Sequence, residues 1–451
     1  MFSAVIRAFR TADLRNKLLF TLAIVAIYRL GSFIPAPNVD FSAVRQCLDL
    51  ASQASNTASS SGPSQLYQLV NLFSGGALLQ LSIFALGIMP YITASIITQL
   101  LRVVIPRFET LHQEGQAGQA KLTQYTRYLT IALGILQSTT LVAVARSGAL
   151  FGNSGAGNNV LTPAGQTPIG TILIVLVMTA GTGLIMWLGE LVTEHGIGNG
   201  MSLLIFTSIA SGFPGSFAQI AASPSNGWET LIAVIAIGIV IMAAVILVEQ
   251  SQRRVPVQYA KRMVGRREFG GQSSYIPIKV NMAGVVPVIF ASSLLYLPAL
   301  IAQFNQPAPG EKVAPWVSWV SEYLTKSDKP VYMLMYFALI FGFTYFYVAI
   351  TFNSEEVADN MKQSGGFIPG IRAGKPTQAF LDYVISRITF PGAIYLGLIA
   401  LIPLIAFSAL GTSSKFPFGG TSILIIVGVG LESVKQINAQ MQQRNYEGLL
   451  K

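Results

Sequence analysis

Residues 66–102 read LYQLVNLFSGGALLQLSIFALGIMPYITASIITQLLR and have the pattern of a membrane helix that is broken in two. The first part, 66–74, has apolar residues at helical spacing, but it reaches only ~14 Å, about half of the ~30 Å hydrocarbon core of a bilayer. Two glycines follow, and the uncharged part 78–101 is long enough to cross, although Gly87 and Pro90 weaken a helix at its middle. Irregular backbone at membrane depth must be buried in protein or line a water-filled cavity, so we expect this stretch to border such a cavity. A tightly packed helix pair, with the short part at the membrane interface, is the alternative.

The composition places the chain among polytopic membrane proteins. The residues are 52% hydrophobic and 11% charged, and the mean hydropathy is +0.56, which excludes an ordinary soluble domain. The single cysteine, Cys47, excludes an intrachain disulfide, and His112 and His195 lie far apart with no thiol or carboxylate cluster beside them. We therefore expect no metal site and no cofactor.

Apolar runs predict ten membrane-spanning helices. They lie near residues 18–35, 78–101, 126–146, 169–191, 200–222, 230–249, 281–303, 331–352, 382–410 and 418–436. The first run follows a basic stretch like a signal peptide, but it lacks a small-residue cleavage site, so we expect a retained helix. Residues 51–65, rich in Ser, Ala and Gln, are expected to form a flexible loop outside the membrane.

The positive charges predict the orientation of these spans. With ten spans the two termini lie on one side, and that side carries 22 of the 29 lysines and arginines. Because positively charged loops remain in the cytoplasm, we expect the N- and C-termini to be cytoplasmic.

The centres of the predicted spans contain no Asp, Glu, Lys, Arg or His. Ion-coupled transporters use such residues as carriers, and redox subunits use them as cofactor ligands. An intramembrane protease needs a nucleophile and base, or an acidic pair. The pattern therefore favours a passive apolar conduit, which can gate by dewetting. A secondary transporter of a small solute is the alternative, because broken helices also occur in that class.

Two cytoplasmic loops are long and basic. Residues 250–281 alternate like a β-hairpin at Val255, Val257 and Tyr259, and residues 353–380 place one arginine between glycines. Exposed arginines on protruding loops suit the docking of phosphate or an acidic protein. The alternative is that these charges only orient the spans.

Nine motifs of the chain resemble the SecY/Sec61-alpha family, the pore subunits of protein-conducting channels. They are YRLGSFIPAP (28–37), FSGGAL (73–78), IFALGIMPYITASIITQLL (83–101), QYTRY (124–128), MWLGELVTEHGIGNGMS (186–202), QRRVPVQYAKR (252–262), KVNMAGVVPVIFASS (279–293), NSEEVADNMKQSGGFIPGIRAGKPT (353–377) and FGGTSILI (418–425). The motifs extend over nearly the whole chain in the family's order, so the resemblance is highly specific.

The resemblance implies an all-α polytopic membrane protein with ten transmembrane helices in two pseudo-symmetric five-helix halves around a central pore. Residues 1–222 would form the N-terminal half, and residues 223–451 the C-terminal half, with cytoplasmic loops at about 250–280 and 353–381. A re-entrant plug helix would lie at about 66–76. Its residues are Leu66, Leu69, Val70, Asn71, Phe73, Ser74, Gly75 and Gly76.

The resemblance also assigns roles within the pore. The constriction ring would be formed by Ile88, Ile92, Met201, Ile205, Ile289 and Ile425. Met201 departs from the β-branched residue that the family often has there. Thr93 and Tyr296 would face each other at a lateral gate that opens toward lipid.

The two basic loops would dock the motor protein SecA and the ribosome, with possible contact to ribosomal RNA. The docking residues are Arg253, Arg254, Lys261, Arg262, Arg266, Arg267 and Arg372. Other implied partners are the SecE and SecG subunits, signal sequences, nascent polypeptides and membrane lipids. The chain contains no P-loop pattern, so the energy for transport would come from SecA or the ribosome rather than from this non-enzymatic subunit. The implied location is the inner (plasma) membrane of a bacterium.

Overall fold

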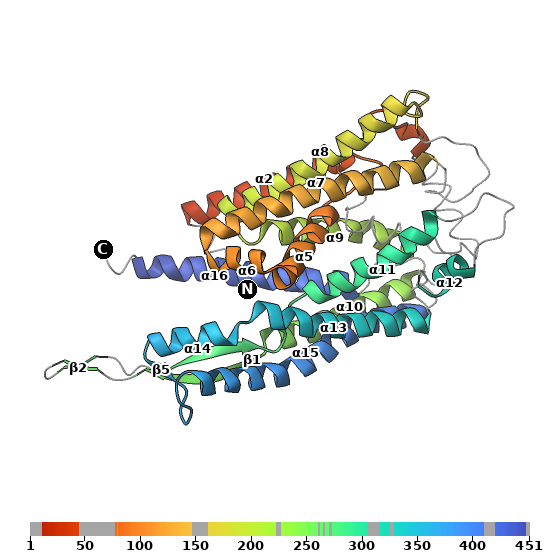
Figure 1. The fold of residues 1–451 in the computed structure, drawn as a ribbon. Coiled ribbons are helices and arrows are strands. Elements are labelled where there is room, and N and C mark those ends of the chain that lie inside the picture. The colour runs from red at the N-terminus through yellow and green to blue at the C-terminus, as the bar shows by residue number, and fades with distance from the viewer. Residues whose placement is uncertain are drawn as a thin grey trace.

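The computed structural model describes residues 11–44, 77–78, 80–146, 161–221, 227–259, 262–264, 267–269, 273–304, 315–324, 329–409 and 420–447. Long helices with a shared overall direction dominate the fold (Figure 1). The helices are α2 (Ala12–Phe33), α5 (Met89–Val104), α6 (Pro106–Gln113), α7 (Gln116–Arg146), α8 (Pro168–His195), α9 (Gly200–Ala221), α10 (Gly227–Gln250), α11 (Val286–Phe304), α12 (Pro315–Tyr323), α13 (Pro330–Thr351), α14 (Ser354–Gln363), α15 (Lys375–Ala409) and α16 (Gly420–Glu447).

Six helical stretches of the described residues are long and apolar enough to cross a bilayer. They are Asp13–Phe33, Pro168–His195, Leu231–Gln250, Pro330–Gln363, Lys375–Ile405 and Ser422–Gln442. The other four predicted spans are helical over part or all of their length, as α5, α7, α9 and α11. The predicted multi-pass, helical architecture is therefore observed.

The helix in the opening stretch begins later than the sequence pattern suggests. A continuous span was expected from residue 78, but residues 83–88 form turns and α5 begins at Met89. Gly87 has φ +56°, a left-handed conformation that suits glycine, and Pro90 lies in the first helical turn, where its missing N–H needs no partner. The two residues thus delimit the helix instead of weakening its middle.

The irregular backbone before α5 is buried in protein and hydrogen-bonded to the segment after α2. The Ala36 N–H donates to the Leu81 carbonyl at 2.9 Å, and the Ile83 N–H donates to the Ile34 carbonyl at 3.0 Å. Phe84 is buried and stacks on Tyr28 of α2, with ring centroids 5.9 Å apart. These contacts satisfy the rule that non-helical backbone at membrane depth needs protein cover.

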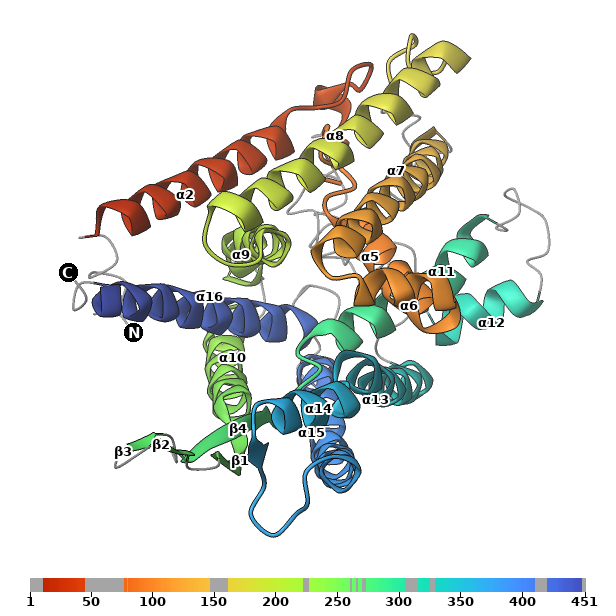
Figure 2. The ribbon, with the colours of Figure 1, turned by 60° about the vertical axis from the view of Figure 1, so that its left-hand side comes forward.

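The packing divides into two bodies and a junction. One hydrophobic cluster takes its buried residues from 36–178, and a second from 241–431. Helix α16 packs against α9 of the first body and α10 of the second, and Figure 2 shows it between the two groups of helices. The division of the chain into two halves near residue 222, and the pseudo-symmetry of these halves, stay predictions.

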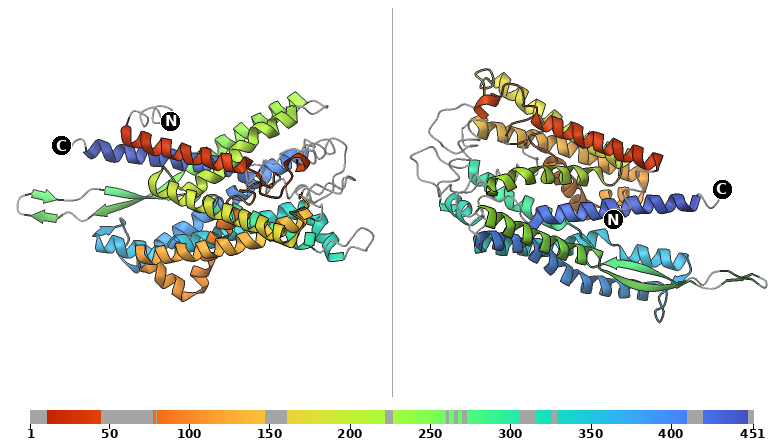
Figure 3. Two further views of the ribbon diagram at one scale, coloured as in Figure 1. Left: turned by 90° about the horizontal axis from the view of Figure 1, so that it is seen from above. Right: turned by 180° about the vertical axis from the view of Figure 1, so that it is seen from behind.

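A small sheet protrudes from one end of the helices (Figure 3). Strands β4 (Ser273–Lys279), β1 (Gln252–Tyr259) and β5 (Gly366–Phe367) form it, and all pairs are antiparallel. Val255 and Val257 are buried against α15, as their alternation predicts, whereas Tyr259 is exposed. Beyond them, β2 (Arg262–Val264) pairs with β3 (Arg267–Phe269) in a separate ribbon. The hairpin expected from the alternation is thus present.

Candidate functional site

An apolar cluster forms the junction between the two bodies, and it contains all six residues predicted for the constriction ring. The six come from four separate places in the chain: the start of α5, α9, α11 and α16. Their buried members are Ile88, Met201, Ile205 and Ile425, and Ile92 and Ile289 are partly buried against them. The fold therefore brings together residues that are more than 300 positions apart in the chain, as 88 and 425 are.

Local structure explains why Met201 belongs to this cluster. The Asn199 side-chain Oδ1 accepts a hydrogen bond from the Met201 N–H at 3.1 Å, which caps the start of α9. A Cβ atom on Gly189 of α8 would overlap the Met201 sulfur, so the glycine makes the room that the thioether fills. Sequence reasoning missed Gly189, although its place in the GELVTEHGIGNG motif could have indicated a close approach of two helices.

The cluster carries little polarity around the ring residues. One hydrogen bond between side chains joins the Tyr28 hydroxyl of α2 to the Ser208 Oγ of α9 at 2.6 Å, so both groups are satisfied. Tyr28 and Ser208 are buried. The buried hydroxyls of Ser82 and Ser422, which are close in the chain to Ile83 and Ile425 of the cluster, have no described hydrogen-bond partner. The remaining walls are aliphatic and aromatic, and such walls disfavour a continuous file of water.

The two residues predicted for the lateral gate lie on α5 and α11. The Thr93 hydroxyl donates to the Met89 carbonyl of its own helix at 3.0 Å, so it is satisfied without a partner across the gate. Tyr296 lies on α11, and its side chain is outside what the structure describes. Their facing arrangement stays a prediction.

A contact that sequence reasoning missed connects α5 to α13. The Arg102 Nη2 in the last turn of α5 donates to the Ile350 carbonyl, near the end of α13, at 3.2 Å. The last turn of α13 has no basic residue of its own. Arg102 therefore supplies a cation to a helix C-terminus in the other body, which is a favourable position for positive charge.

The strands that carry the described docking arginines of the first loop lie at the end of the molecule that also carries the C-terminal end of α16 (Figure 3). Arg253 and Arg254 are exposed on β1, and the Arg254 guanidinium lies 4.9 Å from the centroid of the Tyr275 ring. Arg262 and Arg267 lie on the β2–β3 ribbon, and Lys261 and Arg266 are outside the described residues.

Arg372 is exposed in the turn between β5 and α15. Gly370 and Gly374 flank it with φ +85° and +104°, conformations that side chains rarely adopt, so the turn depends on these glycines. The Thr377 hydroxyl donates to the Arg372 carbonyl at 2.9 Å and ties the turn to the start of α15.

The structure joins the two basic loops that the sequence presents as separate. Gln258 of β1 is opposite Phe367 of β5 in the sheet, and Tyr259 is opposite Gly366. The arginines of both loops therefore project from one shared platform. The predicted plug residues 66–76 lie outside the described residues, next to Ala77 and Leu78, which are buried. Within the described ranges, no three His, Cys, Asp or Glu side chains gather where they could hold a metal ion.

Bundled apolar helices, an apolar cluster at the junction of two bodies and a basic platform at one end are typical of a membrane channel protein. The sequence model of the SecY family matches residues 82–434. The chain belongs to the SecY family.

Individual relatives support this assignment. The chain is 61% identical over 453 residues to the protein translocase subunit SecY of Streptomyces galbus, and the match covers all of both chains. The fold is similar to that of a protein conducting channel, with a TM-score of 0.57 at 20% identity, covering 94% of this chain and 92% of the other. It is also similar to Sec61 in a canine ribosome-channel complex from the endoplasmic reticulum, with a TM-score of 0.56 at 19% identity and the same coverage.

Family membership confirms the class predicted from the sequence. The chain is a bacterial multi-pass membrane protein and a protein translocase subunit that forms a channel. The alternatives of a small-solute transporter and an intramembrane enzyme are not supported by the family.

Proposed function

We propose that this chain forms the pore through which unfolded polypeptides cross the membrane, sealed at rest by the six-residue apolar ring. The observation that carries this proposal is the convergence of residues from four distant segments into one apolar cluster at the junction of the two bodies. Such a junction can widen when the bodies move apart, because the described residues of the cluster meet there through apolar side-chain packing.

The seal works because water between apolar walls loses hydrogen bonds that the walls cannot replace. An extended polypeptide can push the aliphatic side chains aside, and they close around it again. In this proposal residues 66–76 form a plug that supports the seal from the extracytoplasmic side.

Ion conductance tests the ring. Replacing Ile92 and Ile205 with Asn should raise the resting conductance of reconstituted vesicles, because an amide re-wets the constriction. The matched Ile92→Val, Ile205→Val variant keeps the walls apolar and should leave the conductance low. If the Asn variant leaked no more than the wild type, Ile92 and Ile205 would not be part of the constriction.

The proposal includes a side exit between α5 and α11 for apolar segments of the substrate. A signal sequence is an apolar helix that gains free energy on entering lipid, so an aqueous pore that delivers it must open laterally. Thr93 and Tyr296 are the proposed gate residues.

We further propose that the basic platform faces the cytoplasm and docks the partners that drive transport. The positive charge of its loops supports this orientation, and with it cytoplasmic N- and C-termini. The similarity to Sec61 in a ribosome-channel complex supports the ribosome as one partner. SecA as the alternative motor, and SecE and SecG as companion subunits, follow from the family resemblance and are proposed on that ground.

A further inference from the structure

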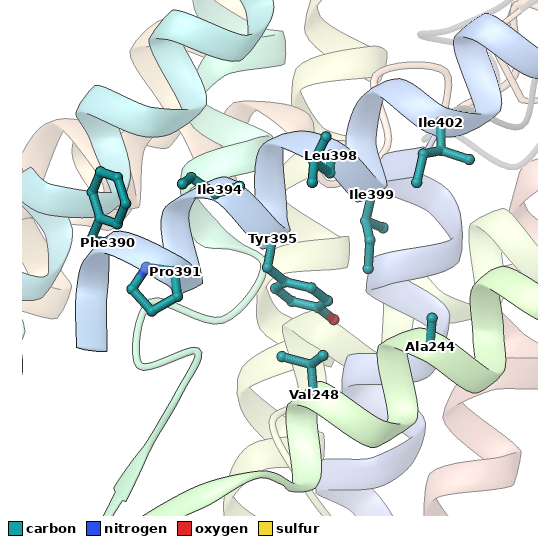
Figure 4. Close-up of a pocket in the computed structure, with 9 residues that line it drawn as sticks. All are labelled: Ala244, Val248, Phe390, Pro391, Ile394, Tyr395, Leu398, Ile399 and Ile402. Atoms are coloured by element: carbon teal, nitrogen blue, oxygen red, sulfur yellow. The ribbon is translucent and has the colours of Figure 1, made fainter. Parts of the chain in front are cut away.

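An apolar groove lies on the outer side of the second body, between α10 and α15 (Figure 4). Its volume is about 400 Å³. Ala244 and Val248 of α10 form one wall, and Tyr395, Ile399 and Ile402 of α15 form part of the other. The groove and the ring cluster share no residue, so they are separate features of the molecule.

The shape of the groove follows from its residues. Ala244 is small and leaves a hollow that a larger side chain would fill. Figure 4 shows the Tyr395 ring pointing from α15 toward α10 across this hollow. Its hydroxyl donates to the Val245 carbonyl at 3.4 Å, so the polar tip is satisfied and the ring presents an apolar face.

Both walls belong to helices that are apolar enough to cross a bilayer. The rim of the groove is half exposed at Phe390, Leu398 and Ile402, as is expected for side chains that meet lipid. The lining extends from 390 to 402 along α15, a rise of ~18 Å, which is close to the ~15 Å depth of one leaflet. The groove therefore has the length and polarity for one acyl chain.

A positively charged side chain lies close to the end of the groove that Phe390 and Pro391 form. Arg387 is exposed and lies one turn before Pro391, so it shares the face of α15 that lines the groove. Side chains on a helix lean toward its N-terminus, which directs this guanidinium toward the end of α15 that lies near the basic platform. It lies 5.4 Å from the centroid of the Tyr383 ring, an aromatic residue of the type enriched at membrane interfaces.

The charge of Arg387 is available for a ligand. Among the described residues it has no carboxylate within ion-pair distance. Glu249, whose charge acts on Tyr395, accepts a hydrogen bond from Asn281, and Lys279, Lys435 and Glu432 lie close enough to act on its own charge.

We propose that this groove is a binding site for an anionic phospholipid, with one acyl chain between α10 and α15 and the phosphate on Arg387. A guanidinium binds phosphate through paired N–H donors, and an anionic headgroup such as phosphatidylglycerol adds net charge that a zwitterionic lipid lacks. The lipid would fill the hollow that Ala244 leaves in the packing of the two helices.

Quenching of tryptophan by brominated lipids tests the site in the full-length chain with its companion subunits. Trp187, Trp228, Trp316 and Trp319 are replaced by Phe, and Leu398→Trp places a single reporter on the rim of the groove. The reporter is then titrated twice against unlabelled phosphatidylcholine, once with brominated phosphatidylglycerol and once with brominated phosphatidylcholine, and the relative affinity is read from the two quenching curves.

We expect phosphatidylglycerol to be preferred about fivefold, the contribution of one basic residue near an anionic lipid. Arg387→Gln should abolish the preference, and Lys362→Gln, the same charge change on exposed α14, should retain it. Ala244→Phe should reduce quenching by both lipids because it fills the hollow.

Two results would overturn the proposal. Equal quenching by the two lipids would show that Arg387 selects no headgroup. Absence of quenching by either lipid, with the reporter folded and fluorescent, would show that a protein segment covers the groove instead of lipid.

Discussion

Replacing Arg102 with Met tests whether the contact between α5 and α13 holds the two bodies of the channel together. The Arg102 guanidinium donates to the Ile350 carbonyl at 3.2 Å, and this hydrogen bond joins helices on either side of the proposed exit. Methionine preserves the length and apolar stem of the side chain but has no donor. The C-terminus of α13, whose own last turn has no basic residue, would then lose the cation that contacts it.

The expected magnitude follows from the type of bond. A hydrogen bond to a charged group contributes ~1.5–3 kcal/mol, and the lower end applies because the contact is only partly buried. A loss of ~1.4 kcal/mol changes an equilibrium tenfold, so the Arg102→Met variant should populate the open arrangement about ten times more. The open population of Arg102→Lys should lie between those of the wild type and Arg102→Met, because lysine keeps the charge but not the planar guanidinium.

The assay is a distance measurement between two spin labels on the two bodies. Lys121→Cys on α7 and Gln363→Cys on α14 are exposed positions for the labels, after Cys47→Ser removes the single native thiol. Electron–electron double resonance then gives the fraction of molecules with the longer distance.

A matched control is Arg107→Met on α6, which removes an exposed arginine five positions further along the chain. It should leave the distance distribution unchanged. If Arg102→Met also gave the wild-type distribution, the hydrogen bond would not be a determinant of opening, and the reasoning would be refuted.

Three further predictions concern the gate, the plug and the platform. A Thr93→Cys, Tyr296→Cys disulfide should block translocation until it is reduced; full transport by the cross-linked form would contradict the gate assignment. Deletion of 66–76 should preserve assembly while raising the ion leak, as measured by purification yield and conductance, and loss of assembly would contradict a plug held only by packing. Arg372→Glu should leave insertion intact but weaken the binding of SecA by ~2–5 kcal/mol if the side chain is buried on docking, whereas Arg253→Glu should mainly slow ribosome association in a salt-dependent way. If Arg372→Glu bound SecA with wild-type affinity, and protease mapping showed normal topology, the docking role of these arginines would be refuted. Their charges would then serve only to orient the spans.

Much of the architecture can be read from the sequence, because a bilayer constrains its proteins so strongly. Uncharged runs of sufficient length have few alternatives to a spanning helix, so the predictions near 169–191, 230–249 and 331–352 correspond to α8, α10 and α13. The alternation of Val255 and Val257 indicated a hairpin for the same kind of reason, since period-two burial suits a strand. The quoted motifs identified the family through similarity rather than physics.

Contacts between distant segments depend on tertiary structure. Nothing local in the sequence indicates that Tyr259 would be paired with Gly366, because the energy of a sheet comes from its partner strand. The start of α5 at Met89 likewise required the segment 34–36, whose backbone forms hydrogen bonds with the turns before the helix.

The sequence by itself determined the class of this protein, because the length and hydropathy of its apolar runs decide whether a chain enters a membrane. The tertiary structure decided which residues meet. Arg102 contacts Ile350, and Ala244 leaves a hollow beside Tyr395, only because helices from separate parts of the chain pack side by side. Packing depends on the shapes of both surfaces at once, and one-dimensional patterns describe each surface alone.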